Sequence, residues 1–346
     1  MNPVCLVIWE RRRQSRRSEM NNRDEVMTKR CFLCGVYRYL LPALFILLPQ
    51  LGAAEALDRE LREAALIGDI ELVDQLLKKG ASPNSQTRFG KSALMFAVEE
   101  GNDEVAFRLI GLGADVNAKS VAGCTALTFS AEGGYSELAA KLLEQGANTQ
   151  IKTRAGWDAL MIATRYNHLG VMAVLLQHGA SVNTSDKDGM TALMTAADKG
   201  YFKAVQLLLE AGADTYVRNR EGATALMIAA QTGRYLIVKR LLEQGANVQA
   251  LSSDGATALF WAAGGGHVHT VELLLEFGAE IDHQSSDGST ALMEAVLTAS
   301  EKGVTALLKS GADVTLKDKS GKSAVDYATQ SKRAGIIQLL EQFNKK

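Results

Sequence analysis

The stretch Gly189–Gly200 reads GMTALMTAADKG, and it returns 33 residues later at Gly222–Gly233 as GATALMIAAQTG. A second phrase, Gly-Ala, keeps the same period and stands 23 residues after each opening glycine but the last. A fixed period over most of a chain predicts a stack of identical supersecondary units, because one such unit is too small to bury its own apolar face. The opening glycines are Gly90, Gly123, Gly156, Gly189, Gly222, Gly255, Gly288 and Gly321.

Each unit is predicted to contain a helix, a turn, a second helix and a protruding loop. In the unit that opens at Gly189, the side chain of Thr191 is predicted to cap a first helix, which ends at Gly200. A second helix is expected from about Phe202 to Gly212, with its leucines on one side. The polar stretch that follows is expected to be an extended, turning loop.

Side-chain size predicts how the units stack. The first helix carries an invariant alanine where neighbours approach closely, and the second helix carries two adjacent leucines. Burying one such leucine is worth roughly 1.5–3 kcal/mol, and only a neighbouring unit can bury it. A thin and a thick layer predict a curved array with the first helices and the loops on its concave side. The alanines are Ala93, Ala126, Ala159, Ala192, Ala225, Ala258 and Ala291, and the pairs are Leu142-Leu143, Leu175-Leu176, Leu208-Leu209, Leu241-Leu242, Leu274-Leu275 and Leu307-Leu308.

These units resemble ankyrin repeats, whose 33-residue period carries the phrase Thr-Pro-Leu-His-x-Ala. Here Ala192 replaces the proline and Met194 replaces the histidine. The resemblance covers residues 57–346 and implies an all-α fold: an ankyrin-type α-solenoid of about nine helix-turn-helix units with protruding β-turn loops, preceded by a signal peptide. We expect methionine packing to substitute for the missing histidine, at Met95, Met161, Met194, Met227 and Met293.

The opening of the chain differs in kind from the repeats. Lys29 and Arg30 precede an apolar run at 39–51, which is followed by Ala54-Glu55-Ala56. A positive flank, a short apolar core and a small-x-small site are typical of a secretory signal peptide. The core is shorter than the roughly 20 apolar residues that a membrane span needs. Removal is therefore the expectation, and an uncleaved anchor is the alternative.

Cleavage after residue 56 would leave Leu57 first, where the repeat count independently begins. The chain is predicted to be periplasmic or secreted, from a bacterium. The expected parts are a removed signal peptide at 1–56 with an over-extended start and Met20 or Met27 as the initiator, an N-terminal capping repeat at 57–89, seven repeats at 90–320 and a C-terminal capping repeat at 321–346.

Charge and cysteine content exclude several classes of function. Residues 57–346 carry 29 Lys and Arg against 34 Asp and Glu, a net charge of −5, which argues against a nucleic-acid partner. Cys31 and Cys34 lie in the segment expected to be removed, and a single pair supplies half the ligands of a structural zinc. Cys124 is expected to be exposed and inert, with an intermolecular bridge as the alternative.

No catalytic, cofactor or metal site is recognisable in the repeats. Gly321-Lys322-Ser323 lacks the earlier glycine of a phosphate-binding loop, so it is interpreted as an ordinary opening of a repeat. His267 and His269 lack a third metal ligand, and His267 is expected to pack its ring at the turn between helices. The expectation is a protein that is not an enzyme.

The resemblance implies that partners contact the loop tips and the exposed side of the first helix. One unit stands out at these positions, with Arg154, Trp157, Arg165 and Tyr166, because Trp, Tyr and Arg dominate binding hot spots. The alternative is that Trp157 folds over its own loop. Neighbouring units add Met190, Asp198, Lys199 and Glu132 to the candidate protein-binding site.

We therefore expect a monomeric, exported, non-catalytic scaffold that binds another protein. The alternatives are an effector or toxin-neutralising inhibitor that masks a partner's active site, and an accessory factor in peroxide defence. A hydrolase built on the array is disfavoured, since no set of nucleophile, base and acid is recognisable. The sequence does not identify the partner.

Overall fold

The computed structural model describes residues 53–344, so the predicted signal peptide and the choice of initiator lie outside the described residues, apart from the last positions before Leu57. The chain divides into two units between Ala56 and Leu57, and the repeats belong to the second. In the described part, eighteen helices form nine successive pairs, and no β-strand occurs there. This confirms the all-α solenoid of helix-turn-helix units.

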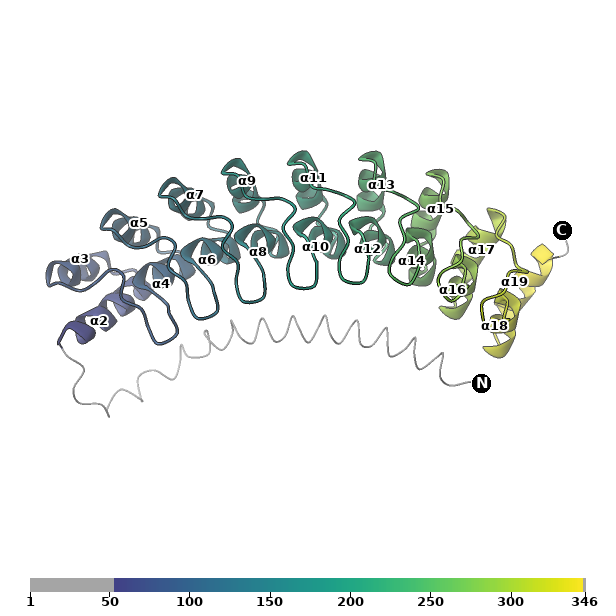
Figure 1. Ribbon diagram of the computed structural model, residues 1–346, viewed down its shortest axis with the longest axis horizontal. Helices are drawn as coiled ribbons and strands as arrows, with labels where there is room; N and C mark the ends of the chain where they lie inside the picture. The colour runs from purple at the N-terminus through teal and green to yellow at the C-terminus, as the bar shows by residue number, and fades with distance from the viewer. Residues whose placement is uncertain (1–52, 345–346) are drawn as a thin grey trace. The chain divides into compact units, whose positions relative to one another are not determined.

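Within the repeats, the first and second helices form two layers, and the loops project from the layer of first helices, on the concave side (Figure 1). This is the curvature expected from the small and large side chains. The first helices are α2 (Ala53–Ile67), α4 (Ala93–Glu99), α6 (Ala126–Gly133), α8 (Ala159–Arg165), α10 (Ala192–Lys199), α12 (Ala225–Gln231), α14 (Ala258–Gly265), α16 (Ala291–Leu297) and α18 (Ala324–Gln330). The second helices are α3 (Ile70–Lys78), α5 (Asp103–Gly111), α7 (Ser136–Glu144), α9 (Leu169–Gln177), α11 (Phe202–Glu210), α13 (Tyr235–Glu243), α15 (Val268–Glu276), α17 (Glu301–Lys309) and α19 (Ala334–Asn344).

The predicted cap of the first helix is present. The hydroxyl of Thr191 accepts a hydrogen bond from the amide of Met194 at 3.2 Å and satisfies an amide that has no partner within the helix. The helix ends at Gly200, which takes the left-handed conformation with a φ of 78°. In three units a residue with a side chain takes this left-handed position instead, at Asn167, Ala299 and Lys332.

In three of the six leucine pairs the two residues differ in burial, which the sequence pattern did not predict. Leu142 is completely buried, whereas its neighbour Leu143 is half-buried. Adjacent residues on a helix point about 100° apart, so Leu142 faces the core while Leu143 keeps part of its surface exposed. The expected methionine packing is confirmed, since all five methionines are nearly inaccessible to solvent; they are Met95, Met161, Met194, Met227 and Met293.

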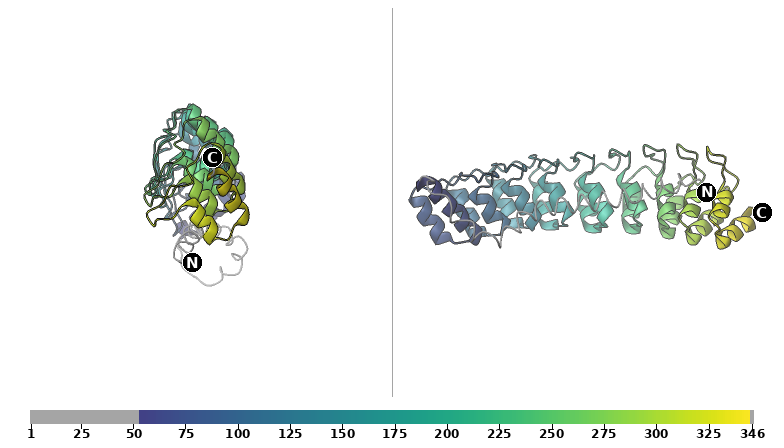
Figure 2. Two further views of the ribbon diagram at one scale, coloured as in Figure 1. Left: turned by 90° about the vertical axis from the view of Figure 1, so that its right-hand side faces the viewer. Right: turned by 90° about the horizontal axis from the view of Figure 1, so that it is seen from below.

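Neighbouring loops are joined to one another along the edge of the array. The amide of Val121 donates to the carbonyl of Phe89 at 2.8 Å, and the amide of Arg154 donates to the carbonyl of Ala122 at 2.8 Å. Equivalent bonds join later loops, for example between Arg220 and Asp188 at 2.9 Å. The loops therefore form a row along one side of the helices (Figure 2).

Candidate protein-binding site

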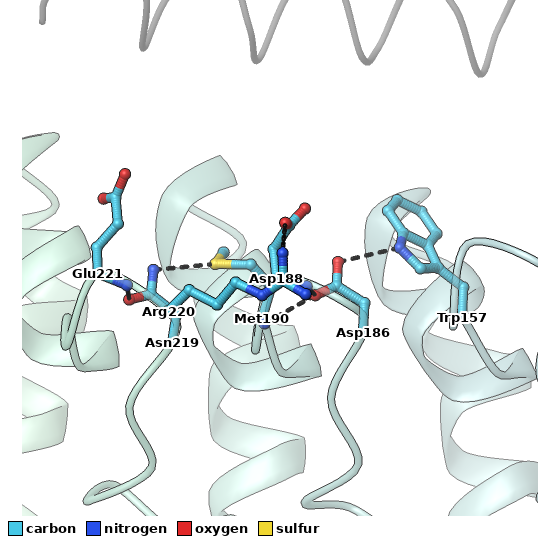
Figure 3. A network of polar contacts seen from close by, with 7 residues as sticks. All are labelled: Trp157, Asp186, Asp188, Met190, Asn219, Arg220 and Glu221. Atoms are coloured by element: carbon cyan, nitrogen blue, oxygen red, sulfur yellow. Dashed lines mark hydrogen bonds and ion pairs between the residues drawn. The ribbon is translucent and has the colours of Figure 1, made fainter.

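Trp157 lies on the loop before α8 and reaches towards the next loop. Its indole Nε1 donates a hydrogen bond to Oδ2 of Asp186 at 3.1 Å, and the side chain is half-buried (Figure 3). The indole therefore bonds to the neighbouring unit, whereas the alternative was that the ring folds over its own loop. The hydrogen bond fixes the direction in which the indole ring points.

Asp186 holds both its own turn and the tryptophan. Its other carboxylate oxygen, Oδ1, accepts hydrogen bonds from the amides of Asp188 at 2.8 Å and Met190 at 2.9 Å. The carboxylate of Asp188 in turn lies 3.4 Å from the guanidinium of Arg220 on the following loop. One polar network thus connects three consecutive loops (Figure 3).

Arg165, at the end of α8, stacks on the tryptophan. Its guanidinium carbon lies 4.9 Å from the centroid of the Trp157 ring, within the range of a cation–π interaction. Arg154, on the tip of the same loop, is exposed. The structure therefore brings Trp157 and Arg165 together from a loop and a helix, with the indole also bonded to the next repeat.

Tyr166 follows Arg165 and has 44% of its surface exposed. Its hydroxyl donates to Oε1 of Glu132 at 3.4 Å, and its ring lies 6.1 Å from that of His168. Burial raises the pKa of Glu132 above its ordinary value, and the negative charge of Glu99 raises it further, while the bond from Tyr166 acts in the opposite direction. Tyr166 and Glu132 thus form a second pair across a repeat boundary.

The remaining candidate residues belong to the unit after Trp157. Met190 is half-buried, and its sulfur lies 3.6 Å from the side-chain nitrogen of Asn219. Asp198 and Lys199 are half-buried at the end of α10, with 3.8 Å between carboxylate and ammonium. They add charges of both signs to the concave side of the array.

A family model described as ankyrin repeats in three copies matches residues 61–153, 142–219, 184–252 and 226–318. The chain belongs to the ankyrin repeat family. Ankyrin repeats generally act as scaffolds for interactions between proteins, and ankyrin repeat proteins are typically non-catalytic. No curated protein matches the chain.

Asp186, the residue that anchors Trp157, was not among the candidate residues predicted from the sequence. A signal was present, because every unit has a hydroxyl, amide or carboxylate side chain three residues before the opening glycine. Seven of the eight hold the turn by accepting a backbone hydrogen bond, as Thr153 does from Trp157 at 3.2 Å. The exception is Ser285, whose hydroxyl donates to the carbonyl of Ser289 at 2.9 Å. A carboxylate differs from a hydroxyl in having a second acceptor oxygen, and Asp186 uses it for the indole. The eight residues are Thr87, Ser120, Thr153, Asp186, Asn219, Ser252, Ser285 and Asp318.

Two histidines of the array, His168 and His267, join neighbouring repeats. Nε2 of His267 lies 3.0 Å from the carbonyl oxygen of Gln231, and Nε2 of His168 lies 3.0 Å from that of Glu132. The ring of His267 was expected to pack at the turn between helices, and its hydrogen bond to Gln231 shows that it also contacts the preceding unit. Among the described residues, no three His, Cys, Asp or Glu side chains come together in a way that could hold a metal ion.

The side chain of Cys124 is less exposed than the sequence predicted. The side chain is half-buried rather than exposed, and burial raises the pKa of its thiol. The thiolate, which is the reactive form, is therefore disfavoured at this position. A separate observation is that none of the described helices is long and apolar enough to cross a membrane.

Proposed function

We propose that this chain is an exported, non-catalytic ankyrin scaffold that binds another protein through its concave face and loop tips. The centre of the binding surface is the cluster Arg154, Trp157, Arg165 and Tyr166, near the middle of the array. Met190, Asp198, Lys199 and Glu132 surround this cluster. The chain is further proposed to act as a monomer.

The observation that supports this proposal best is the fixed position of Trp157. A hydrogen bond to Asp186 and the stacked guanidinium of Arg165 hold the indole from two sides. Ordering a side chain at an interface costs about 0.5–1.5 kcal/mol, and a residue that is ordered beforehand avoids part of that cost. Tryptophan and arginine are also the residue types that contribute most to hot spots.

Tyr166 extends the same surface. Its ring is substantially exposed, while its hydroxyl is tied to Glu132, so a partner would meet an aromatic face that is already oriented. Because Glu132 belongs to α6 and Tyr166 directly follows α8, the surface spans two repeats. A partner that contacts both residues would be sensitive to the packing of the repeats against each other.

Export is proposed from the signal-like segment and is supported by the surroundings of the expected cleavage site. Ala54 and Glu55, at the start of α2, are exposed, and the first completely buried residue is Leu61. The described side chains at 54–56, which cleavage would remove, are therefore not buried.

The experiment compares capture by the tagged full chain and by a variant with Trp157→Ala, Arg165→Ala and Tyr166→Ala. Both chains are expressed in the native cells. Proteins that the wild-type chain captures and the variant does not are then purified and titrated against each chain by calorimetry. We expect the triple variant to lose more than about 2 kcal/mol of binding free energy with unchanged helical circular dichroism. Equal affinity of both chains would refute this site.

A further inference from the structure

The first three loop tips carry basic side chains and no acidic one. These turns lie at 86–90, 119–123 and 152–156, in the row of loops along one side of the helices (Figure 2). Backbone hydrogen bonds of 2.8 Å join the first turn to the second and the second to the third. All of the basic side chains are exposed, so their charges face solvent on three neighbouring turns. They are Arg88, Lys119, Lys152 and Arg154.

Two large apolar side chains project from the same turns. Phe89 is 56% exposed and Val121 is 48% exposed, and the amide of Val121 donates to the carbonyl of Phe89, so the two residues are neighbours. The next four turns along the chain carry an acidic residue directly before the opening glycine, where the first turn carries Phe89. The combination of basic and apolar side chains is therefore found at the N-terminal end of the row. The acidic residues are Asp188, Glu221, Asp254 and Asp287.

The acidic residues of the first repeats are held away from the tips. Each tip leads into the N-terminal end of a first helix, whereas Glu99, Glu100 and Glu132 stand at the other ends of α4 and α6. A helix such as α4 is about 10 Å long, which is also about the distance over which 0.1 M salt screens a charge. Glu99 is also paired with Lys91. Asp115, in the second loop, accepts from a backbone amide of its own loop at 2.8 Å. The tips therefore present a positive potential to a surface that approaches them.

We infer that these tips dock the array against the surface of a membrane that contains anionic lipid. Each basic side chain near such a surface strengthens binding about fivefold, and this attraction falls off within a Debye length. The two apolar side chains enter the boundary between head groups and acyl chains, where they are removed from water. Docking of this kind holds the array at the membrane without inserting a helix.

The apolar side chains are the reason to favour a lipid surface over a nucleic acid. Single-stranded nucleic acids bind by stacking their bases on aromatic rings, and Val121 offers no ring. The guanidinium of Arg88 lies 4.7 Å from the centroid of the Phe89 ring and covers one of its faces. The acyl boundary of a bilayer, in contrast, accepts aliphatic and aromatic side chains alike.

The place of these turns in the chain favours a membrane over an acidic polypeptide. They belong to the first repeats after the apolar run at 39–51, which is the core of the signal-like segment. Under the proposed export, on which this inference rests, the first repeats emerge beside the membrane that the chain crosses. After removal of the segment, the basic and apolar tips would still hold the array at that surface.

The test measures how the chain isolated from its native cells partitions onto lipid vesicles in a cosedimentation assay. One set of vesicles contains phosphatidylglycerol in phosphatidylcholine, and the other contains phosphatidylcholine alone. A retained apolar run would bind both sets, so the ratio of the two partition constants reports the charged contact. We expect a ratio of about ten or more at low salt, which falls as salt is added.

Removal of charge locates the contact. Arg88→Gln, Lys119→Gln and Lys152→Gln together are expected to lower the ratio about fivefold or more. Arg154 stays in place because it belongs to the proposed protein-binding site. The matched control removes three exposed charges from the second helices and is expected to leave the ratio unchanged; its residues are Lys203, Lys239 and Lys302.

Removal of apolar surface separates a lipid surface from other polyanions. Phe89→Ser with Val121→Ser is expected to weaken binding to the anionic vesicles about threefold or more, because these side chains enter the bilayer boundary. Leu236→Ser, at a side chain on α13 that is 60% exposed, is the control and is expected to change nothing. A single-stranded oligonucleotide and polyglutamate are titrated against the same chains by anisotropy.

Three results would overturn the inference. The first is equal partition onto both sets of vesicles. The second is a ratio that falls no further in the tip variant than in its control. The third is a complex with the oligonucleotide or polyglutamate, at about 0.15 M salt, that needs the basic tips and survives Phe89→Ser with Val121→Ser; this would assign the tips to that polyanion. Failure of the proposed export would be seen separately, in the N-terminus and the location of the native chain.

Discussion

The indole nitrogen of Trp157 and the carboxylate of Asp186 are joined by a hydrogen bond of 3.1 Å that crosses from one ankyrin repeat to the next. The two residues lie 29 positions apart in the chain. The bond makes the direction of the tryptophan depend on the relative position of two loops. The affinity of a partner that binds Trp157 would therefore depend on how the two repeats are packed, as well as on which residues they contain.

Replacement of Asp186 by asparagine should separate the two tasks of this residue. Asn219 holds the equivalent turn of the next repeat by accepting from the amides of Glu221 and Ala223, so Asp186→Asn is expected to keep the turn. The indole bond is expected to be lost, at a cost of about 1 kcal/mol. Hydrogen exchange of the Trp157 indole proton, followed by NMR, is the measurement. Protection equal to that of the wild type would show that Asp186 does not order the ring.

The unequal burial of the leucine pair predicts unequal effects of truncation. Leu142→Ala removes a completely buried side chain and is expected to cost about 2–5 kcal/mol of unfolding free energy. Leu143→Ala, at the half-buried neighbour, is the matched control and is expected to cost less than half as much. Urea titration followed by circular dichroism measures both. Equal losses would contradict the assignment of Leu142 to the core and of Leu143 to its margin.

Glu132 predicts a pH dependence of stability. Burial first, and the charge of Glu99 second, raise its pKa in the folded chain, so folding favours the protonated form. This contribution to stability is present below the unfolded pKa of roughly 4.3 and is lost as the pH rises through the folded pKa. Glu132→Gln, which cannot ionise and keeps an acceptor for Tyr166, is therefore expected to be more stable than the wild type at neutral pH.

The gain from Glu132→Gln should shrink as the pH falls below about 4, where the wild-type carboxyl is protonated as well. Urea midpoints across the pH range measure this difference. Glu137→Gln, at an exposed position on α7, is the control. A gain that stays the same at all pH values would rule out ionisation of Glu132 as its cause.

The proposed export predicts the N-terminus of the native protein. Mass spectrometry of the chain isolated from its native cells is expected to find Leu57 as the first residue, because the small-x-small site ends at Ala56. Ala56→Asp should block processing, since the site requires a small residue. An intact mass that includes the apolar run at 39–51 would instead support a retained anchor.

The sequence by itself determined the repeat, the two helices of each unit, the cap at Thr191, the left-handed turn at Gly200 and the burial of the methionines. These features depend on residues close together in the chain or on a period repeated in every unit, so local patterns carry them. The sequence was also sufficient to choose Trp157, Arg165 and Tyr166 as candidate binding residues, because the choice used only residue type and position within the repeat.

Only the tertiary structure decided which of these residues touch. The bond from Trp157 to Asp186, the pair of Tyr166 with Glu132, the half-buried thiol of Cys124 and the unequal leucines all depend on how one repeat lies against the next. A periodic sequence fixes the contents of each unit. The small rotation and translation between units determine which side chains reach across the boundary, and these arise from the packing of many residues at once.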